Sequence, residues 1–97
     1  MPFEDDTLLR LHFKKHKNEF TFASAEEYQS AADVFMSGPV LPPVRECVRP
    51  NGDRIRFNRG DRWIAIQASS GWLKTFHAPG DKYIRLAYFQ WECKRSM

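Results

Sequence analysis

The sequence predicts an α+β domain in which two amino-terminal helices pack on one face of an antiparallel sheet. Apolar residues with helical spacing occur twice before residue 38, and short alternating segments separated by turn residues follow. The 97 residues allow one domain with one modest core. We therefore predict a single barnase-like domain over residues 1–97, with helices within residues 5–37 and a sheet of four or five strands within residues 44–91.

The first helix is predicted from Leu8 to about Lys17. Asp5 and Asp6 precede it and suit an N-cap and first turn, because their carboxylates can accept hydrogen bonds from the free backbone amides there. A helical wheel places six side chains on one arc that should face the sheet: Leu8, Leu9, Leu11, His12, Phe13 and His16. Both histidines should therefore point inward.

A capping box predicts the second helix, since Ser24 precedes Glu27 by three residues. Apolar side chains follow at positions i, i+3, i+4 and i+7, namely Tyr28, Ala31, Ala32 and Phe35. The helix should end near Gly38, because a glycine favours a helix end and the proline that follows cannot continue the helix.

Alternating segments predict the strands. The segments are Val44 to Arg49, Arg54 to Asn58, Trp63 to Gln67 and Gly71 to Pro79. We expect four apolar residues of these segments to face the two helices: Ile55, Phe57, Ile64 and Ile66. The polar positions between them would then form an open face for a ligand. Tyr83 to Phe89 also alternates and suits a fifth strand, although a short terminal helix fits it too.

The charge distribution suits an anionic partner. Fifteen Lys and Arg against 12 Asp and Glu give a formal net charge of +3, and cations outnumber acids between residues 45 and 82. Acidic residues gather instead near the amino terminus, at Glu4, Asp5 and Asp6. This acidic start and the short apolar runs predict neither a signal peptide nor a membrane span.

The two cysteines, Cys47 and Cys93, form no CxxC or CxxH pair, which disfavours a zinc ribbon or a redox motif. Two cysteines also do not make a disulfide framework. We interpret both as small buried or bystander residues in a protein of a reducing compartment.

Several short motifs, taken in order, resemble small bacterial ribonuclease toxin domains. The motifs are His12-Phe13-Lys14-Lys15-His16 with Glu19-Phe20, Ala25-Glu26-Glu27-Tyr28 with Ala32 and Phe35, Gly52-Asp53 with Arg56-Phe57, and Gly71 with Thr75-Phe76 and Pro79. They resemble the barnase, EndoU, colicin D and RelE-like nuclease superfamily, which occurs at the tips of contact-dependent inhibition and other polymorphic toxins. Where that pattern usually has a second aromatic residue after Thr-Phe, this chain has His77.

The resemblance implies a metal-independent ribonuclease that needs no cofactor and acts as a monomer on tRNA or other structured RNA in the bacterial cytoplasm. It also implies a cognate immunity or antitoxin protein. The functional helix histidine and late hydroxyl of colicin D-like members fall on His16 and Thr75, with Lys15 and Arg56 as supporting residues.

The residue types also fit RNA cleavage on chemical grounds. Cleavage needs a base for the 2′-hydroxyl proton, an acid for the leaving 5′-oxygen and donors that stabilise the phosphorane. His16 and His77 would supply the acid and base, Lys15 and Arg56 would hold the phosphate, and Thr75 would donate a hydrogen bond. The further RNA-binding residues would be Arg54, Lys74, Trp72 and Tyr83.

His16 should lie within reach of Thr75, with Arg56 or His77 nearby, in one concave polar site at the margin of the sheet.

Structural interpretations of the same residues stay open. A histidine on an apolar helix arc is often a core residue, and arginines on a strand often belong to a solvated face. His12 and His16 have the i, i+4 spacing of metal ligands, but neither an HExxH motif nor an evident third ligand accompanies them, so we expect no metal site. The alternative function is a non-catalytic RNA- or protein-binding module on the same fold.

Overall fold

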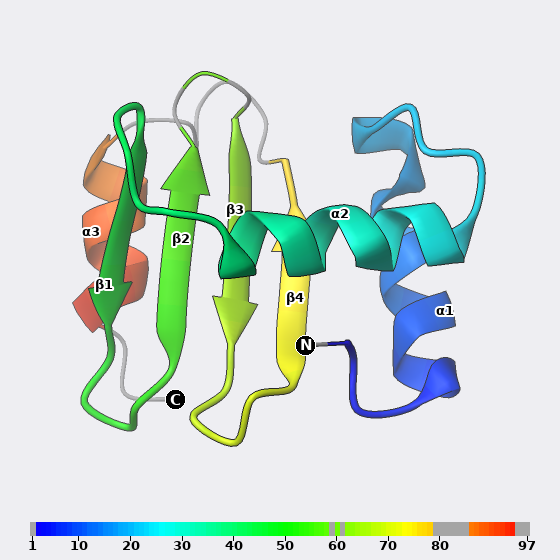
Figure 1. The fold of residues 1–97 in the computed structure, drawn as a ribbon, viewed down its shortest axis with the longest axis horizontal. Coiled ribbons are helices and arrows are strands. Elements are labelled where there is room, and N and C mark those ends of the chain that lie inside the picture. The colour runs from blue at the N-terminus through cyan, green and yellow to red at the C-terminus, as the bar shows by residue number, and fades with distance from the viewer. Residues whose placement is uncertain (1, 59, 61, 79–85, 95–97) are drawn as a thin grey trace.

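A computed structural model of the protein describes residues 2–58, 60, 62–78 and 86–94, with only the backbone of residues 86–88. Its elements are α1 (Asp6–His16), the 3-10 helix η1 (Lys17–Glu19), α2 (Ala25–Ser37), β1 (Val44–Val48), β2 (Arg54–Asn58), β3 (Trp63–Gln67), β4 (Leu73–His77) and α3 (Leu86–Lys94). The strands form one sheet in the order β1-β2-β3-β4, and all neighbours are antiparallel (Figure 1). The predicted α+β class is confirmed. No helix within these ranges has the length and apolar character needed to cross a membrane.

The helix starts follow the capping residues of the sequence. Oδ1 of Asp5 accepts a hydrogen bond from the amide of Leu8 at 2.8 Å, so α1 begins after Asp5. At the start of α2, the hydroxyl of Ser24 accepts from the amide of Glu27 at 3.2 Å, and the Glu27 carboxylate accepts from the amide of Ala23 at 2.7 Å. The predicted caps of both helices are therefore correct.

The buried face of α1 is narrower than predicted. Leu9 and His16 are buried, whereas Leu8 is 37% exposed and Leu11 is 58% exposed. α1 lies beside the edge strand β4, while α2 crosses over the sheet (Figure 1). A helix at a sheet edge has less of its surface covered, so Leu8 and Leu11 fall outside the contact.

The sheet is covered on both faces, and this corrects the predicted orientation of the strands. The core against α1 and α2 contains Phe3, Leu9, Ala25, Tyr28, Ala32, Met36, Ala65, Leu73 and Phe76. The second core contains Ile55, Phe57, Ile64, Ile66 and Phe89. The four apolar residues expected to face the amino-terminal helices therefore face α3, which lies behind β1 and β2 (Figure 1). The prediction that one face of the sheet is open and polar was therefore wrong.

The last described segment is the helix α3, so the sheet has four strands and the prediction of a fifth strand was wrong. The alternative of a terminal helix was right. Phe89 and Cys93 are four residues apart, and both pack on the second core, as helical spacing requires. Of the predicted strand, residues 83–85 lie outside the described part of the chain.

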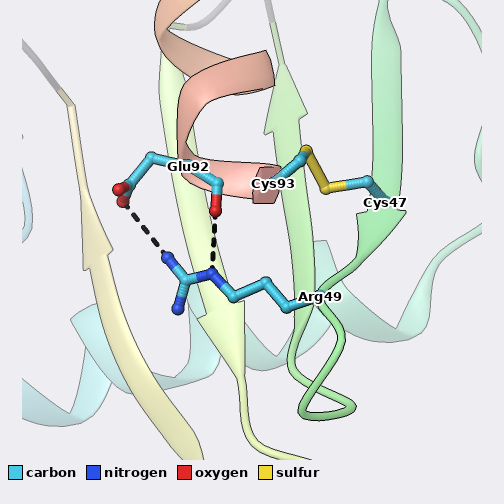
Figure 2. The surroundings of a disulfide bond; sticks show 4 residues. All are labelled: Cys47, Arg49, Glu92 and Cys93. Atoms are coloured by element: carbon cyan, nitrogen blue, oxygen red, sulfur yellow. Dashed lines mark hydrogen bonds and ion pairs between the residues drawn. A yellow bond between two sulfur atoms is a disulfide. The ribbon is translucent and has the colours of Figure 1, made fainter. Parts of the chain in front are cut away.

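A disulfide joins α3 to the sheet, so the interpretation of the cysteines as bystanders was wrong. Cys47 of β1 bonds to Cys93 of α3, with 6.1 Å between their Cα atoms (Figure 2). Beside it, Nε of Arg49 donates to the backbone carbonyl of Glu92 at 2.8 Å, and Nη2 of Arg49 lies 3.6 Å from the Glu92 carboxylate (Figure 2). Disulfides are typical of oxidising compartments, in contrast to the reducing compartment that we expected.

Candidate functional site

Three element ends meet at one place beside β4. His16 is the last residue of α1, Glu19 is the last residue of η1, and His77 is the last residue of β4. The imidazole rings of His16 and His77 stack with 5.0 Å between centroids and 21° between planes. Oγ1 of Thr75 lies 3.3 Å from Nδ1 of His77. Residues far apart in the sequence thus form one cluster of an acid, a hydroxyl and two imidazoles.

Glu19 connects the two sides of this cluster. One carboxylate oxygen lies 2.7 Å from Nδ1 of His16, and the other accepts a hydrogen bond from the backbone amide of Ala78 at 2.7 Å. The carboxylate therefore orients the His16 ring and ties the end of α1 to the end of β4. We had assigned no role to Glu19, although its i, i+3 spacing from His16 was a usable signal.

Burial keeps two of the three histidines neutral. The pKa of His77 is lowered to about 4, mainly by burial and also by the charges of His16 and Lys15, while Glu19 opposes the shift. Burial also lowers the pKa of His12, helped by the charges of His16 and Lys15. At neutral pH, the imidazoles of His77 and His12 are therefore uncharged.

The lowered pKa of His77 makes a testable contribution to stability. Unfolded His77 binds its second proton below about pH 6.5, whereas the folded protein accepts it only near pH 4. The contribution is present above pH 6.5, is lost as the pH falls toward 4, and is on the order of 3 kcal/mol in full. Urea titrations from pH 7 to pH 4.5 should show a steeper loss of unfolding free energy for the natural protein than for His77→Asn. Equal slopes would contradict the shift.

An aromatic column continues from this cluster along α1. His12 stacks between Phe3 and His16, with ring centroids 5.0 Å and 6.1 Å away respectively. Nδ1 of His12 is buried and has no hydrogen-bond partner within the described residues. The described part of the chain thus leaves this ring nitrogen without a hydrogen bond.

Arg56 does not belong to the cluster. It pairs with Ala65, which pairs with Phe76, so its side chain points to the opposite face of the sheet from Thr75 and His77. Arg56 is buried and donates to Glu46 at 2.7 Å and to the carbonyls of Phe35 and Gly38 at 2.7 and 2.6 Å. Of the two groups expected near His16, only His77 is there.

Arg54 has a similar structural role beside Arg56. Its guanidinium donates to Glu46 at 2.9 Å, to Gln67 at 2.8 Å and to the carbonyl of Met36 at 3.2 Å. The two arginines thus satisfy carbonyls at the end of α2, where the helix leaves acceptors free and the dipole attracts cations. Burial alone would raise the pKa of Glu46, but hydrogen bonds from Arg56 and Arg54 hold it below its ordinary value.

The other predicted residues are distributed around the site. Nζ of Lys74 donates a hydrogen bond to the carboxylate of the buried Asp53 at 2.9 Å. Trp72 is half-buried and directly precedes β4. Lys15 is exposed in the last turn of α1, and its charge reaches His77. Tyr83 lies outside the described residues.

Three lysines are exposed at or just after the end of α1, namely Lys14, Lys15 and Lys17. Their side chains point in different directions around the helix axis, and of the three only Lys15 acts on the pKa of His77. None of the three forms an ion pair with another residue in the described ranges. The sequence predicted a site role for Lys15 alone of the three lysines.

His16 and His77 are groups for proton transfer, and Lys15, whose charge acts on His77, is a cation that can bind an anion. Across residues 2–58, 60, 62–78 and 86–94, no three His, Cys, Asp or Glu side chains are placed so that they could hold a metal ion. A scan against protein-family models gives no match, and a comparison with curated proteins gives none either.

Proposed function

We propose that this protein is a metal-independent endoribonuclease that cleaves tRNA or another structured RNA by acid–base catalysis. One observation carries the proposal. Two imidazoles stack at 5.0 Å where three elements end, and each has a neighbouring side chain that orients it, Glu19 for His16 and Thr75 for His77. An oriented pair of imidazoles can supply both the base and the acid for general acid–base cleavage of RNA.

In the proposed reaction, His77 is the base, because its low pKa leaves it unprotonated at neutral pH. It takes the proton of the 2′-hydroxyl, the 2′-oxygen bonds to phosphorus, and the bond from phosphorus to the 5′-oxygen breaks. His16 gives a proton to that leaving oxygen, and Glu19, which lies 2.7 Å from Nδ1 of His16, orients the ring. An arriving phosphate raises the pKa of His77, which improves it as a base.

Phosphate binding is assigned to Lys15, whose charge acts on His77. Arg54 and Arg56 are not assigned this role, because their guanidinium groups donate to Glu46 and to carbonyls at the end of α2. Each lysine that neutralises a phosphate of single-stranded RNA contributes a slope of about 0.7 to the fall of log K with log salt. Lys15→Ala should therefore weaken RNA binding and lower this slope by about 0.7, as measured by fluorescence anisotropy between 50 and 200 mM salt. Arg45→Ala, an exposed cation on β1, is the matched control. An unchanged slope for Lys15→Ala would contradict this assignment.

The chemistry is tested with a labelled oligoribonucleotide and its 2′-deoxy analogue, both in the presence of a chelator. The proposal expects cleavage of the ribose substrate alone, with 2′,3′-cyclic phosphate and 5′-hydroxyl ends. Cleavage of the deoxy analogue, cleavage abolished by the chelator, or no cleavage of any RNA would reject it.

A non-catalytic binding module for RNA or protein is the second candidate. It is favoured by the burial of His16, which is only 8% exposed. A binder would keep its affinity for RNA in a His16→Ala, Thr75→Ala double variant and would leave the RNA intact.

The partner and the place of action also belong to this proposal. A monomeric ribonuclease acting in the bacterial cytoplasm needs a cognate immunity or antitoxin protein to protect the cell that makes it. Since disulfides form in oxidising compartments, the Cys47–Cys93 bond fits a chain that passes through such a compartment before it meets its RNA. Copurification with the product of a neighbouring gene would test the partner.

A further inference from the structure

A hollow of about 320 Å³ lies between the start of α1 and the hairpin of β3 and β4. Its walls include Leu8, His12, Ser70, Trp72, Leu73 and Lys74. This volume is at the lower end of the range for small-molecule sites, about 300–1,000 Å³. One unpaired nucleotide is a ligand of suitable size.

The walls combine a flat aromatic ring with apolar and polar groups. Trp72 is half-buried and Leu73 is buried, so they provide a fixed apolar surface. Lys74 keeps 41% of its side chain exposed, and its ammonium is held in place by Asp53. A nucleobase can stack on an indole ring, and the ammonium suits a ribose or phosphate oxygen.

The hollow adjoins the proposed catalytic pair at two points. His12 lines it, and the ring of His12 lies 6.1 Å from that of His16. Lys74 also lines it and directly precedes Thr75, which contacts His77. A base bound in the hollow is thus one imidazole away from the groups that would transfer protons.

We propose that this hollow binds one unpaired nucleobase of the RNA and places the neighbouring phosphodiester at His16 and His77. The proposal rests on the proposed ribonuclease function. It defines the substrate class as RNA with a single-stranded nucleotide at the cleavage position, because a base within a duplex cannot reach a hollow lined by Trp72.

Binding is tested first, with uridine monophosphate and with ribose 5-phosphate as a probe that lacks the base. Two-dimensional NMR of the natural protein should show shifts of the indole of Trp72 and the amides of Ser70 and Lys74 with the nucleotide alone. Trp72→Ala should weaken nucleotide binding about 5- to 100-fold, the loss of one base stack. Trp91→Ala, an exposed tryptophan on α3, should leave it unchanged. Equal binding of both probes, or equal affinity of the Trp72 and Trp91 variants, would overturn the proposal.

Cleavage then separates a free nucleotide site from a substrate site. With a five-residue oligouridine, Trp72→Ala should raise KM about tenfold and change kcat little, because base stacking contributes to the ground state and the transition state alike. Trp72→Phe, which retains a ring, should restore most of the affinity and guards against loss by misfolding. An unchanged KM would overturn the subsite even if the RNA is cleaved. Nucleotide binding at Trp72 without any cleavage would retain the base site and reject the ribonuclease.

Discussion

Replacing His16 by alanine should lower RNA cleavage by about two to four powers of ten, the usual contribution of a general acid or base. His16 is the imidazole that Glu19 orients, and it stacks on His77, so its loss removes one of the two proton-transfer groups. The variant should remain folded, because the helix caps and both cores stay in place. The measurement pairs the initial rate of cleavage with a thermal melt of the same sample.

Two further variants serve as controls for His16→Ala. Leu11→Ala changes an exposed residue of the same helix and should leave both rate and melt unchanged. A variant that lacks both His16 and His77 should be about as slow as either single variant, because residues that act as one unit do not have additive effects. Cleavage that persists in His16→Ala, or that disappears only because the protein has melted, would assign His16 to the core.

Removing the disulfide should lower the free energy of unfolding by about 4 kcal/mol. Cys47 and Cys93 are separated by 46 residues in the sequence, and the chain-entropy model gives this value for a loop of that length. Natural protein and a Cys47→Ser, Cys93→Ser double variant are compared by urea titration at equal protein concentration. The urea midpoint of the variant should fall markedly. The backbone amides of α3 should be the first to lose protection against hydrogen exchange, because the disulfide and the Arg49–Glu92 pair both attach α3 to the sheet.

A reducing agent supplies the control for this titration. It should lower the midpoint of the natural protein toward that of the double variant and should not change the variant. Equal midpoints for natural protein and variant without reductant would show that the bond contributes nothing. The reduced midpoint also tests the proposed action in the cytoplasm, since a reduced protein that is unfolded at 37 °C could not act there.

The parts of the fold that depend on local sequence were predictable. Asp5 and the Ser24–Glu27 pair define helix starts through hydrogen bonds within a few residues, and both caps are present. The orientation of the strands was not predictable in the same way. Alternation in β2 shows that one face is apolar, but it does not show whether Ile55 faces α2 or α3. That choice depends on α3, which alternation had suggested to be a strand.

The site was predictable where a residue lies at the end of an element. His16, Thr75 and His77 come together because α1 lies along β4 and the two elements end side by side. The prediction for Arg56 was wrong because the face of the sheet on which its side chain lies depends on the register of β2, β3 and β4, and sequence alone does not give that register. The Cys47–Cys93 bond likewise depends on how α3 packs on β1.

The most direct test of the proposed site is the pH dependence of kcat/KM for cleavage of the ribose oligonucleotide between pH 4 and pH 8, with the fold checked at each pH. Two histidines acting as base and acid predict a bell-shaped profile, because kcat/KM reports the ionisation of both groups in the free protein. The acidic limb should lie toward the pKa of His77, about 4, and His77→Asn should remove that limb together with most of the activity. A flat profile, or one that is the same in the natural protein and in His77→Asn, would contradict acid–base catalysis by this histidine pair.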